Sequence, residues 1–361
     1  MRGSLVECEP AVWWQTEGMD DRDRLLLDEL QNDLPLVARP FAALGDRIGL
    51  PEGEILERIE ALRGEGVVRQ MSAIFDTRRL GYKSQLVAAR SRDNTSDTTA
   101  AVFSSHPGVT HNYRRDHHFD IWFTIAVPPN SVIGMDATVD LLGKMANVES
   151  IRPLPALKFF KIGVDLDMKG DRDPAAKKAK REPTAPAPDP RSLSERDIEA
   201  IRALQTDLPA VPEPIAAVAE PFGFTQDELL AAGERFLATG QMRRFAAVLN
   251  HRNAGFVQNG MGVWKVDEDR CEEMGRVMAG FRGVSHCYQR PIYEDWPYRL
   301  FSMTHGRDKA ECEAVLQAIS DETGLTEYDV LYSTREYKKT RLRYFTPDLE
   351  AWEAAHAALT A

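Results

Sequence analysis

The pentapeptide Gln31-Asn32-Asp33-Leu34-Pro35 returns in the second half of the chain as Gln205-Thr206-Asp207-Leu208-Pro209. The same offset of 174 residues (205 − 31) relates further pairs without a gap: Gly49 and Gly223, Gly66 and Gly240, Arg69 and Arg243. So long a gapless match indicates that one structural unit occurs twice. The chain of 361 residues therefore holds two copies of one unit.

The composition is that of a globular protein, with 43% hydrophobic and 28% charged residues. Its length suits two to four domains. The net charge of -11 argues against non-specific DNA binding as the main activity, because phosphate contacts need a local excess of Lys and Arg. A local basic pocket for an acidic small molecule is compatible with this charge.

The four cysteines, Cys8, Cys271, Cys287 and Cys312, include no C-x-x-C pair. This spacing argues against a zinc ribbon, a redox dithiol or a cysteine-bound iron–sulfur cluster, and so few cysteines suit a reducing cytoplasm. We find neither a signal-peptide core nor the roughly 20 apolar residues that cross a bilayer. The sequence predicts a cytoplasmic protein without a membrane contact and without a metal site of its own.

Each copy begins with helical patterns. In the first copy, apolar residues at helical spacing predict helices over 22–30, 40–48 and 52–63, and Gly49 separates the last two as in a helix-turn-helix. Gly64 and Gly66 end the third helix, and a strand is expected over 67–75. Three helices followed by a strand predict a winged helix-turn-helix.

The rest of each copy alternates strand and helix. In the second copy we expect strands at 255–266, 284–290, 298–305 and 328–332, and helices at 269–281 and 309–323. This β-α-β-β-α-β order predicts a ferredoxin-like unit, and the first copy repeats it over 83–153. A further edge strand, at 158–166 and again at 336–345, is expected to close each copy.

The predicted architecture is an α+β tandem duplication of a winged helix-turn-helix plus a ferredoxin-like (βαββαβ) domain. Residues 169–192, rich in Pro, Ala, Lys and Asp, are expected to be a solvated linker between the copies. The predicted order is an N-terminal tail (1–19), winged helix-turn-helix 1 (20–75), ferredoxin-like domain 1 (76–168), the linker, winged helix-turn-helix 2 (193–249), ferredoxin-like domain 2 (250–345) and a C-terminal helix (346–361).

A winged helix followed by a ferredoxin-like domain resembles the Lrp/AsnC regulators, in both copies. In a DNA-binding member, the third helix should present basic or amide side chains to the groove. Here that helix carries Glu52, Glu54, Glu57 and Glu60 against Arg58 and Arg63. Phosphates repel such a surface, so no DNA partner is expected.

Two strings of residues are more specific than the fold. The first copy reads HNYRRDHHFDIWFT over 111–124, and the second reads HCYQR over 286–290, WPYRLF over 296–301 and HGR over 305–307. They resemble the siroheme decarboxylases, which are Lrp/AsnC-like proteins with two subunit types. The first type carries HNY-x-R-x-H-x-[YF]-x-x-WFT, and the second carries CY-x-R, WPY-x-L[FY] and HGR.

The resemblance implies a carboxy-lyase that converts siroheme to 12,18-didecarboxysiroheme by removing two acetate carboxylates. In the family this product leads to heme d1, used in denitrification, or to heme b by an alternative route. It also implies that both subunit types are fused into an intramolecular pseudo-heterodimer, which could assemble further with itself. No cofactor is implied beyond the iron tetrapyrrole of the substrate.

Loss of CO₂ leaves carbanion character on the methylene carbon, so a proton donor is needed, and histidine suits this role near neutral pH. The catalytic candidates are His117 and His286, followed by His111 and His305. A histidine on a strand is also often a packing residue. His118 is expected to face the opposite side of the sheet from His117, because strand neighbours alternate.

Siroheme carries eight carboxylates, which require guanidinium and ammonium partners, and aromatic side chains can line its flat faces. The substrate-binding candidates are Arg114, Arg115, Tyr113, Trp122, Tyr288, Arg290, Trp296, Arg299, Arg307, Lys338 and Arg341. The basic run from Lys338 to Arg343 is, by composition alone, also typical of a solvated edge.

Two positions depart from the family pattern: Asp120 and Arg299 stand where the family usually has Asn. An acid and a base at matched positions could pair with each other or bind different propionates. An alternative function is that of an Lrp/AsnC-type heme-responsive transcriptional regulator. In such a heme sensor, a histidine would bind the iron without turnover.

Overall fold

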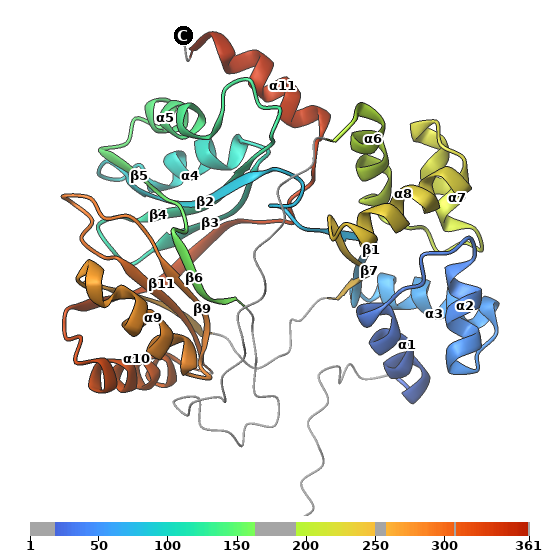
Figure 1. Cartoon of the computed structure of the whole chain (residues 1–361), viewed down its shortest axis with the longest axis horizontal. Coiled ribbons are helices and arrows are strands. Elements are labelled where there is room, and N and C mark those ends of the chain that lie inside the picture. The colour runs from blue at the N-terminus through green and yellow to red at the C-terminus, as the bar shows by residue number, and fades with distance from the viewer. Residues whose placement is uncertain (1–18, 163–192, 250–257, 307, 360–361) are drawn as a thin grey trace, which may run out of the picture.

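The computed structural model describes residues 19–162, 193–249, 258–306 and 308–359. Figure 1 shows two lobes, a helical lobe built from the first part of each copy and a β-rich lobe built from the second part. The predicted linker, Arg307 and the predicted N-terminal tail, apart from Met19, lie outside the described residues. Among the described residues, no helix is both long and apolar enough to cross a membrane.

The helical lobe contains two three-helix units. The first has α1 (Asp21–Asn32), α2 (Pro40–Ile48) and α3 (Glu52–Gly64), and the second has α6 (Glu195–Leu204), α7 (Pro214–Ala219) with η1 (Glu220–Phe222), and α8 (Gln226–Ala238). Gly49 and Gly223 end the second helix of each unit in left-handed conformations that favour glycine. The two units share one hydrophobic core, to which Leu26, Phe41, Ile201 and Phe236 all belong.

The predicted wing strands join the two units. β1 (Val68–Phe75) pairs antiparallel with β7 (Met242–Leu249), in a register that places Met71 opposite Ala247. Each wing therefore finds its partner strand in the other copy.

The β-rich lobe contains two ferredoxin-like units with the predicted element order. The first has β2 (Lys83–Arg90), α4 (Ser96–Ser105), β3 (Val109–Arg115), β4 (Ile121–Val127), α5 (Met135–Met145), β5 (Ser150–Leu154) and β6 (Lys158–Ile162). The second has β8 (Gln258–Trp264), η2 (Glu268–Arg270), α9 (Cys271–Gly280), β9 (Val284–Gln289), β10 (Leu300–Gly306), α10 (Lys309–Thr323) and β11 (Tyr328–Lys339). The chain then forms α11 (Pro347–His356) and η3 (Ala357–Leu359).

The two ferredoxin-like units form one antiparallel sheet of nine strands, in the order β5-β2-β4-β3-β11-β8-β10-β9-β6. The expectation that an edge strand closes its own copy is wrong. β6 of the first copy pairs with β9 of the second, and the last part of β11 pairs with β3 of the first. Each copy thereby covers an edge strand of the other, which would otherwise expose unpaired backbone groups.

Helices cover one face of this sheet. The described core between sheet and helices has two parts: Phe103 and Leu142 belong to the first copy, and Met278 and Leu316 to the second. The opposite face, called here the inner face, has its own core, in which Trp122, Trp296 and Phe301 meet. This inner core comes from both copies, so neither ferredoxin-like unit can bury its inner face alone.

Candidate functional site

The strands β3 and β9 carry a matched set of polar side chains on the inner face. Asn112 donates a hydrogen bond to the carbonyl of Ala100 on α4 (2.9 Å), and the Cys287 thiol donates one to the carbonyl of Gly275 on α9 (3.7 Å). These two side chains therefore face the helices. Because strand neighbours alternate, the flanking side chains face inward: His111, Tyr113 and Arg115 on β3, and His286 and Tyr288 on β9, with Arg290 directly after β9.

The two histidines have equivalent surroundings. The ring centroids of His111 and Tyr113 lie 6.2 Å apart, and those of His286 and Tyr288 lie 5.9 Å apart. Nδ1 of His111 lies 3.0 Å from the Thr110 hydroxyl, and Nδ1 of His286 lies 2.8 Å from the Ser285 hydroxyl. Burial lowers the pKa of both histidines, aided by Lys339 at His111 and by Lys161 at His286.

The two arginines are also equivalent, and both are buried. Arg115 and Arg290 are only 7% and 8% exposed. Arg115 donates to the carbonyl of Leu331 (2.8 Å) and Arg290 to that of Leu154, and the Nε atom of each has no hydrogen-bond partner. Burial lowers the pKa of each guanidinium to about 10, and neither has an ion pair within the described residues. A buried charge without a counter-ion is costly, so each position can accept an anion.

The two copies differ in the side chains that surround these shared residues. In the second copy, the Ser285 hydroxyl also lies 2.7 Å from Nε2 of His305, so one hydroxyl joins two histidines. In the first copy, the Thr110 hydroxyl instead meets that of Thr124 (2.9 Å). In the alignment of the two copies that matches Trp122 with Phe301, the residue equivalent to His305 is Ala126. The two-histidine arrangement therefore belongs to the second copy.

The neighbouring strands extend this difference. Tyr288 makes an edge contact with Phe159 of β6 (5.5 Å between ring centroids), and Phe159 is 43% exposed. Tyr113 instead lies opposite Glu336 of β11, and burial together with this carboxylate raises the pKa of Tyr113 to about 12. We call the cluster of Phe159, Ser285, His286, Tyr288, Arg290 and His305 the His286 pocket, and it is apolar and cationic. We call the cluster of Thr110, His111, Tyr113, Arg115 and Glu336 the His111 pocket, and it contains a carboxylate.

His117 lies in the turn between β3 and β4, against the inner core. Its Nδ1 accepts the backbone N–H of Phe119 (3.0 Å), and its ring meets Trp296 at 5.4 Å. Burial, with a smaller effect of His118, lowers the pKa of His117 to about 4. The prediction that His118 faces away from His117 is wrong, because the two rings lie 3.9 Å apart in a turn where strand alternation does not apply.

Two predicted aromatic residues are packing residues of the inner core. The Trp122 indole donates to the carbonyl of Phe119 (2.7 Å), and its ring lies 5.1 Å from that of Trp296, which is fully buried. Their contacts are with each other and with core side chains. In the register of β3 and β4, Trp122 lies opposite Tyr113 and therefore on the same face of the sheet, whereas Trp296 is enclosed by core side chains.

Several predicted cations have structural partners. Lys338 donates to the carbonyls of Ser104 (2.8 Å) and His106 (3.3 Å), and Arg341 donates to Ser72 Oγ and to the carbonyl of Ala73. These bonds attach β11 and the segment after it to α4 and to β1. Arg114 is exposed on β3, and Arg307 lies outside the described residues.

Asp120 and Arg299 do not pair with each other. Asp120 accepts hydrogen bonds from the hydroxyls of Ser91 and Ser96, both at 2.6 Å, while Arg299 lies 3.4 Å from Glu268. Each of the two positions that depart from the family pattern therefore has a local partner in its own copy.

Sequence reasoning missed four residues of the pockets: Thr110, Ser285, Phe159 and Glu336. A signal existed for Ser285, because a hydroxyl residue precedes the matched histidine in both copies, as Thr110 does in the first. Phe159 and Glu336 reach the pockets only because the edge strands are exchanged, which no local pattern reveals.

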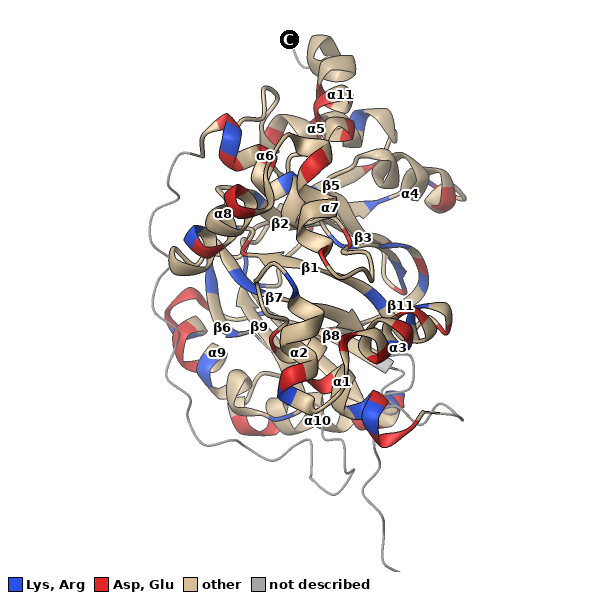
Figure 2. Ribbon diagram, turned by 90° about the vertical axis from the view of Figure 1, so that its right-hand side faces the viewer, with Lys and Arg blue, Asp and Glu red and all other residues tan. Residues whose placement is uncertain are grey.

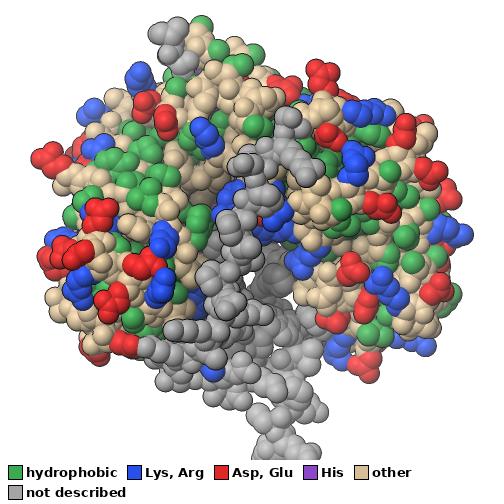
Figure 3. Space-filling view, viewed as in Figure 1, with side chains coloured by type: hydrophobic (Ala, Val, Ile, Leu, Met, Phe, Trp, Pro, Cys, Tyr) green, Lys and Arg blue, Asp and Glu red, His purple; other side chains and the backbone are tan. Residues whose placement is uncertain are grey.

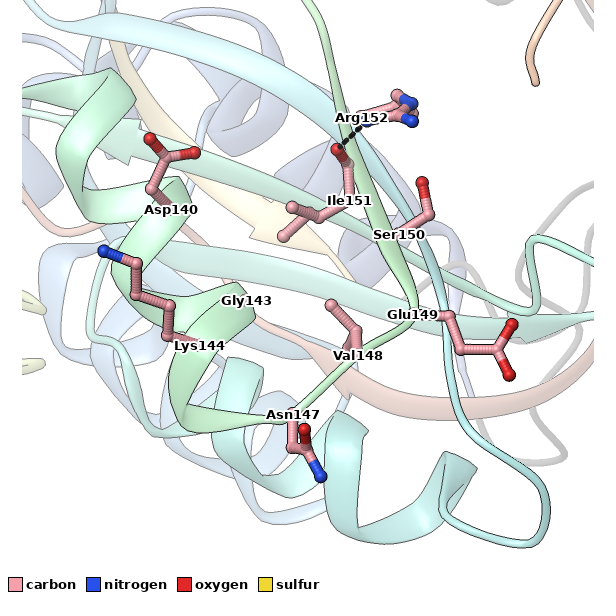
Figure 4. Close-up of a pocket in the computed structure, with 9 residues that line it drawn as sticks. All are labelled: Asp140, Gly143, Lys144, Asn147, Val148, Glu149, Ser150, Ile151 and Arg152. Atoms are coloured by element: carbon pink, nitrogen blue, oxygen red, sulfur yellow. Dashed lines mark hydrogen bonds between the residues drawn. The ribbon is translucent and has the colours of Figure 1, made fainter. Parts of the chain in front are cut away.

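A separate groove lies on the helix-covered side of the sheet. Its lining residues come from α5, β5 and the segment between them: Asp140, Gly143, Lys144, Asn147, Val148, Glu149, Ser150, Ile151 and Arg152. Figure 4 shows the charged side chains pointing apart from one another, and the Arg152 guanidinium is also paired with Asp295 (2.7 Å). The groove holds no histidine and no convergent set of polar groups, so we do not assign it a function.

The two arginines of the third helix of the first unit are paired with carboxylates of the protein. Arg58 contacts the carboxylates of Asp20, Asp23 and Glu54 at 2.7–3.0 Å, and these contacts raise its pKa. Arg63 pairs with Asp207 of the other unit (2.9 Å). Both arginines are therefore engaged within the protein.

Comparison with family models gives matches in both copies. A model described as the AsnC-like ligand binding domain matches residues 79–161 and 253–338. A model described as the siroheme decarboxylase NirDL-like HTH domain matches residues 23–69 and 197–243.

Similar proteins extend over nearly the whole chain. A siroheme decarboxylase from Hydrogenobacter thermophilus is 38% identical over 91% of this chain and 96% of its own length. The separate alpha and beta subunits of siroheme decarboxylase from Desulfovibrio desulfuricans are each 40% identical, and cover 42% and 40% of this chain and 87% and 92% of their own lengths. A crystal structure of the siroheme decarboxylase NirDL in complex with an iron-uroporphyrin III analogue superposes with a TM-score of 0.74, at 33% identity, over 94% of this chain and 99% of that one.

Proposed function

This chain belongs to the siroheme decarboxylase family, and from that membership we propose that it is a carboxy-lyase which converts siroheme to 12,18-didecarboxysiroheme. Matches to separate alpha and beta subunits support an intramolecular pseudo-heterodimer. The observation in this molecule that carries the proposal is the pair of buried guanidiniums, Arg115 and Arg290, without counter-ions among the described residues. Carboxylates of an acidic substrate would supply those counter-ions.

We place the chemistry in the His286 pocket. Arg290 binds a carboxylate that stays on the ring, while Phe159 and Tyr288 provide apolar surface against the macrocycle. A reacting carboxylate held against this apolar surface loses its hydration shell, which favours its departure as CO₂. In the His111 pocket, Glu336 would repel an acidic ligand.

The reaction breaks the bond between the acetate methylene and its carboxylate. The electron pair of that bond stays on the methylene carbon and is delocalised into the conjugated macrocycle. A proton delivered to this carbon gives the methyl group, so each cycle consumes one proton and releases one CO₂. We assign the proton donor as His286, with the Ser285 hydroxyl connecting it to His305.

The substrate itself helps to charge this donor. Burial, with Lys161, lowers the pKa of His286 in the ligand-free protein, so its imidazole is neutral near pH 7. Carboxylates placed nearby favour the imidazolium form and raise this pKa. The pocket therefore becomes a proton donor when its acidic substrate binds.

Other parts of the proposal follow from the chemistry of the reaction. The macrocycle can delocalise the carbanion, so the step requires no cofactor beyond the substrate's own iron tetrapyrrole. We propose the heme d1 route for the product, because fused chains of this kind favour it over the alternative route to heme b. The small number of cysteines favours a cytoplasmic location.

Turnover and binding of siroheme by two matched variants test the site assignment. Under anaerobic conditions, His286→Ala should still bind siroheme but accumulate little decarboxylated product, as seen by chromatography of the extracted tetrapyrrole. His118→Ala, which removes an exposed imidazole, should behave like the unmodified protein. Equal rates for the two variants would remove His286 from the mechanism. Binding without turnover by the unmodified protein would favour the heme-sensor alternative.

A further inference from the structure

The turn that follows the wing strand β1 lies at the border of the His286 pocket. This segment, Asp76–Tyr82, forms a single helical turn, with backbone hydrogen bonds from Leu80 to Asp76 (3.0 Å) and from Tyr82 to Thr77 (3.1 Å). The Asp76 carboxylate accepts the backbone N–H groups of Arg78 (3.0 Å) and Arg79 (3.1 Å). The backbone position of Arg78 is thereby fixed.

A residue of the second copy holds this turn in place. Arg243 on β7 donates two hydrogen bonds to the second oxygen of Asp76, at 2.7 and 3.0 Å. Arg79 also reaches across, donating to the carbonyl of Thr239 (2.8 Å). The turn of the first copy is therefore anchored to the second copy at two points.

In contrast to Arg79 and Arg243, the Arg78 side chain has no hydrogen-bond partner among the described residues. Arg78 is exposed, and within the described residues its guanidinium forms neither an ion pair nor a hydrogen bond. It lies 4.9 Å from the ring centroid of Phe159, which in turn contacts Tyr288 of the His286 pocket. It is also close enough to Tyr288 to favour the ionised form of that phenol, against the larger effect of burial.

Lys and Arg side chains gather at the hollow between the two lobes, although the chain has a net charge of -11 (Figure 3). Figure 2 shows basic residues on strands of both lobes, including β7 and β11. Positive charges gathered at the hollow concentrate acidic ligands there. The Arg78 guanidinium lies over the Phe159 ring and forms no ion pair with any described residue, which suits a flat ligand with carboxylates at its edge.

We propose that Arg78 binds a peripheral carboxylate of the tetrapyrrole in the His286 pocket. This inference rests on the proposed function, and it adds that the helical lobe contributes a substrate-binding residue. The turn after β1 then acts as a carboxylate clamp, and the helix-turn-helix lobe serves the substrate where other proteins of this architecture bind DNA. The binding affinity of a ligand should depend more strongly on Arg78 when the ligand carries more peripheral carboxylates.

Binding of two porphyrins that are not turned over tests this clamp separately from catalysis. The probes are iron uroporphyrin III and iron coproporphyrin III, which carries fewer carboxylates, and the dissociation constant is measured by absorbance titration of the full chain. Arg78→Ala should weaken uroporphyrin binding about tenfold, the factor that corresponds to about 1.4 kcal/mol. The loss for coproporphyrin should be smaller, and Arg78→Lys should recover part of the affinity.

Arg276→Ala is the matched control, because it removes the same charge from the outer side of α9, where the Arg276 side chain is 75% exposed. Its affinity for both porphyrins should stay within about twofold of the unmodified protein, since surface charges contribute little to distant sites. Unchanged uroporphyrin binding by Arg78→Ala, or an equal loss in Arg276→Ala, would overturn the clamp. If the unmodified protein failed to decarboxylate siroheme, the proposed function would fail while the clamp would still stand on these titrations.

Discussion

Replacing the buried Arg290 by methionine should stabilise the ligand-free protein and impair substrate binding at the same time. Burial lowers the pKa of Arg290 from 12.5 to about 10, which corresponds to roughly 3 kcal/mol against the charged form in the folded state. Because the folded-state pKa lies below the unfolded value, this cost is present at every pH below about 10 and is relieved only above it.

Two kinds of favourable contact offset part of that cost. The hydrogen bond from Arg290 to the carbonyl of Leu154 contributes about 1 kcal/mol. The guanidinium also lies 4.8 Å from the Tyr288 ring and 5.2 Å from the Phe301 ring, and such contacts contribute about 1 kcal/mol together. Methionine fills the space without a charge, so the free energy of unfolding should rise by about 1 kcal/mol.

Two assays measure the two halves of this prediction. Urea unfolding, followed by circular dichroism at pH 7, gives the stability of Arg290→Met, and titration with iron uroporphyrin III gives its affinity. Affinity should fall at least tenfold, because a ligand carboxylate loses a buried charged partner. Arg276→Met, which changes an exposed side chain and breaks its ion pair with Glu272, should lower the unfolding free energy by at most about 0.5 kcal/mol and leave the affinity unchanged.

A loss of more than about 2 kcal/mol of unfolding free energy in Arg290→Met would refute the reasoning, because it would show that the guanidinium stabilises the ligand-free fold. Unchanged affinity for the porphyrin would refute the assignment of Arg290 as a carboxylate-binding residue. The first outcome concerns the energetics of the ligand-free pocket, and the second concerns its ligand.

Three further predictions concern the hydroxyl bridge, the protonation of the pocket and the C-terminal helix. Ser285→Ala should lower the decarboxylation rate about tenfold with little change in siroheme affinity. Ser285→Thr, which keeps the hydroxyl as in the first copy, should retain most of the rate. Equal steady-state rates for the two variants would exclude a role for the Ser285 hydroxyl. Siroheme binding should take up protons near pH 7 and turnover should fall as pH rises, because burial lowers the pKa of His286 in the free protein and substrate carboxylates raise it. Calorimetry in buffers of different ionisation enthalpy measures the proton uptake. Binding without proton uptake would contradict the account. Trp352→Ala should cost about 3 kcal/mol of unfolding free energy without altering turnover, because Trp352 packs on the His106 ring (4.3 Å between ring centroids) at the edge of the first helix-covered core. An unchanged urea midpoint would show that α11 adds no stability.

Much of the fold follows from local sequence patterns. α2 and α10 occupy the predicted ranges, because Pro40 and the Asp308 cap define where they begin, and glycines with left-handed conformations follow each helix. The repeat also identifies the two kinds of unit. The partner of an edge strand cannot be predicted in this way, because β6 and β11 have the same alternating pattern whichever copy they pair with.

The candidate site was predictable in part. The resemblance directs attention to Arg115 and Arg290, but only the structure reveals that both are buried and form no ion pair within the described residues. His117 and Trp296 belong to motifs of the same family, yet they meet in the inner core, since that core is built from both copies. The difference between the pockets depends on Phe159 and Glu336, which arrive on exchanged strands.

Turnover of siroheme in D₂O under anaerobic conditions, followed by mass spectrometry of the extracted tetrapyrrole, tests the central claim most directly. If the chain removes both acetate carboxylates and protonates each resulting carbanion, the product lacks two CO₂ equivalents and carries one deuteron in each new methyl group. Recovery of siroheme with an unchanged mass from a protein that demonstrably binds it would contradict the account.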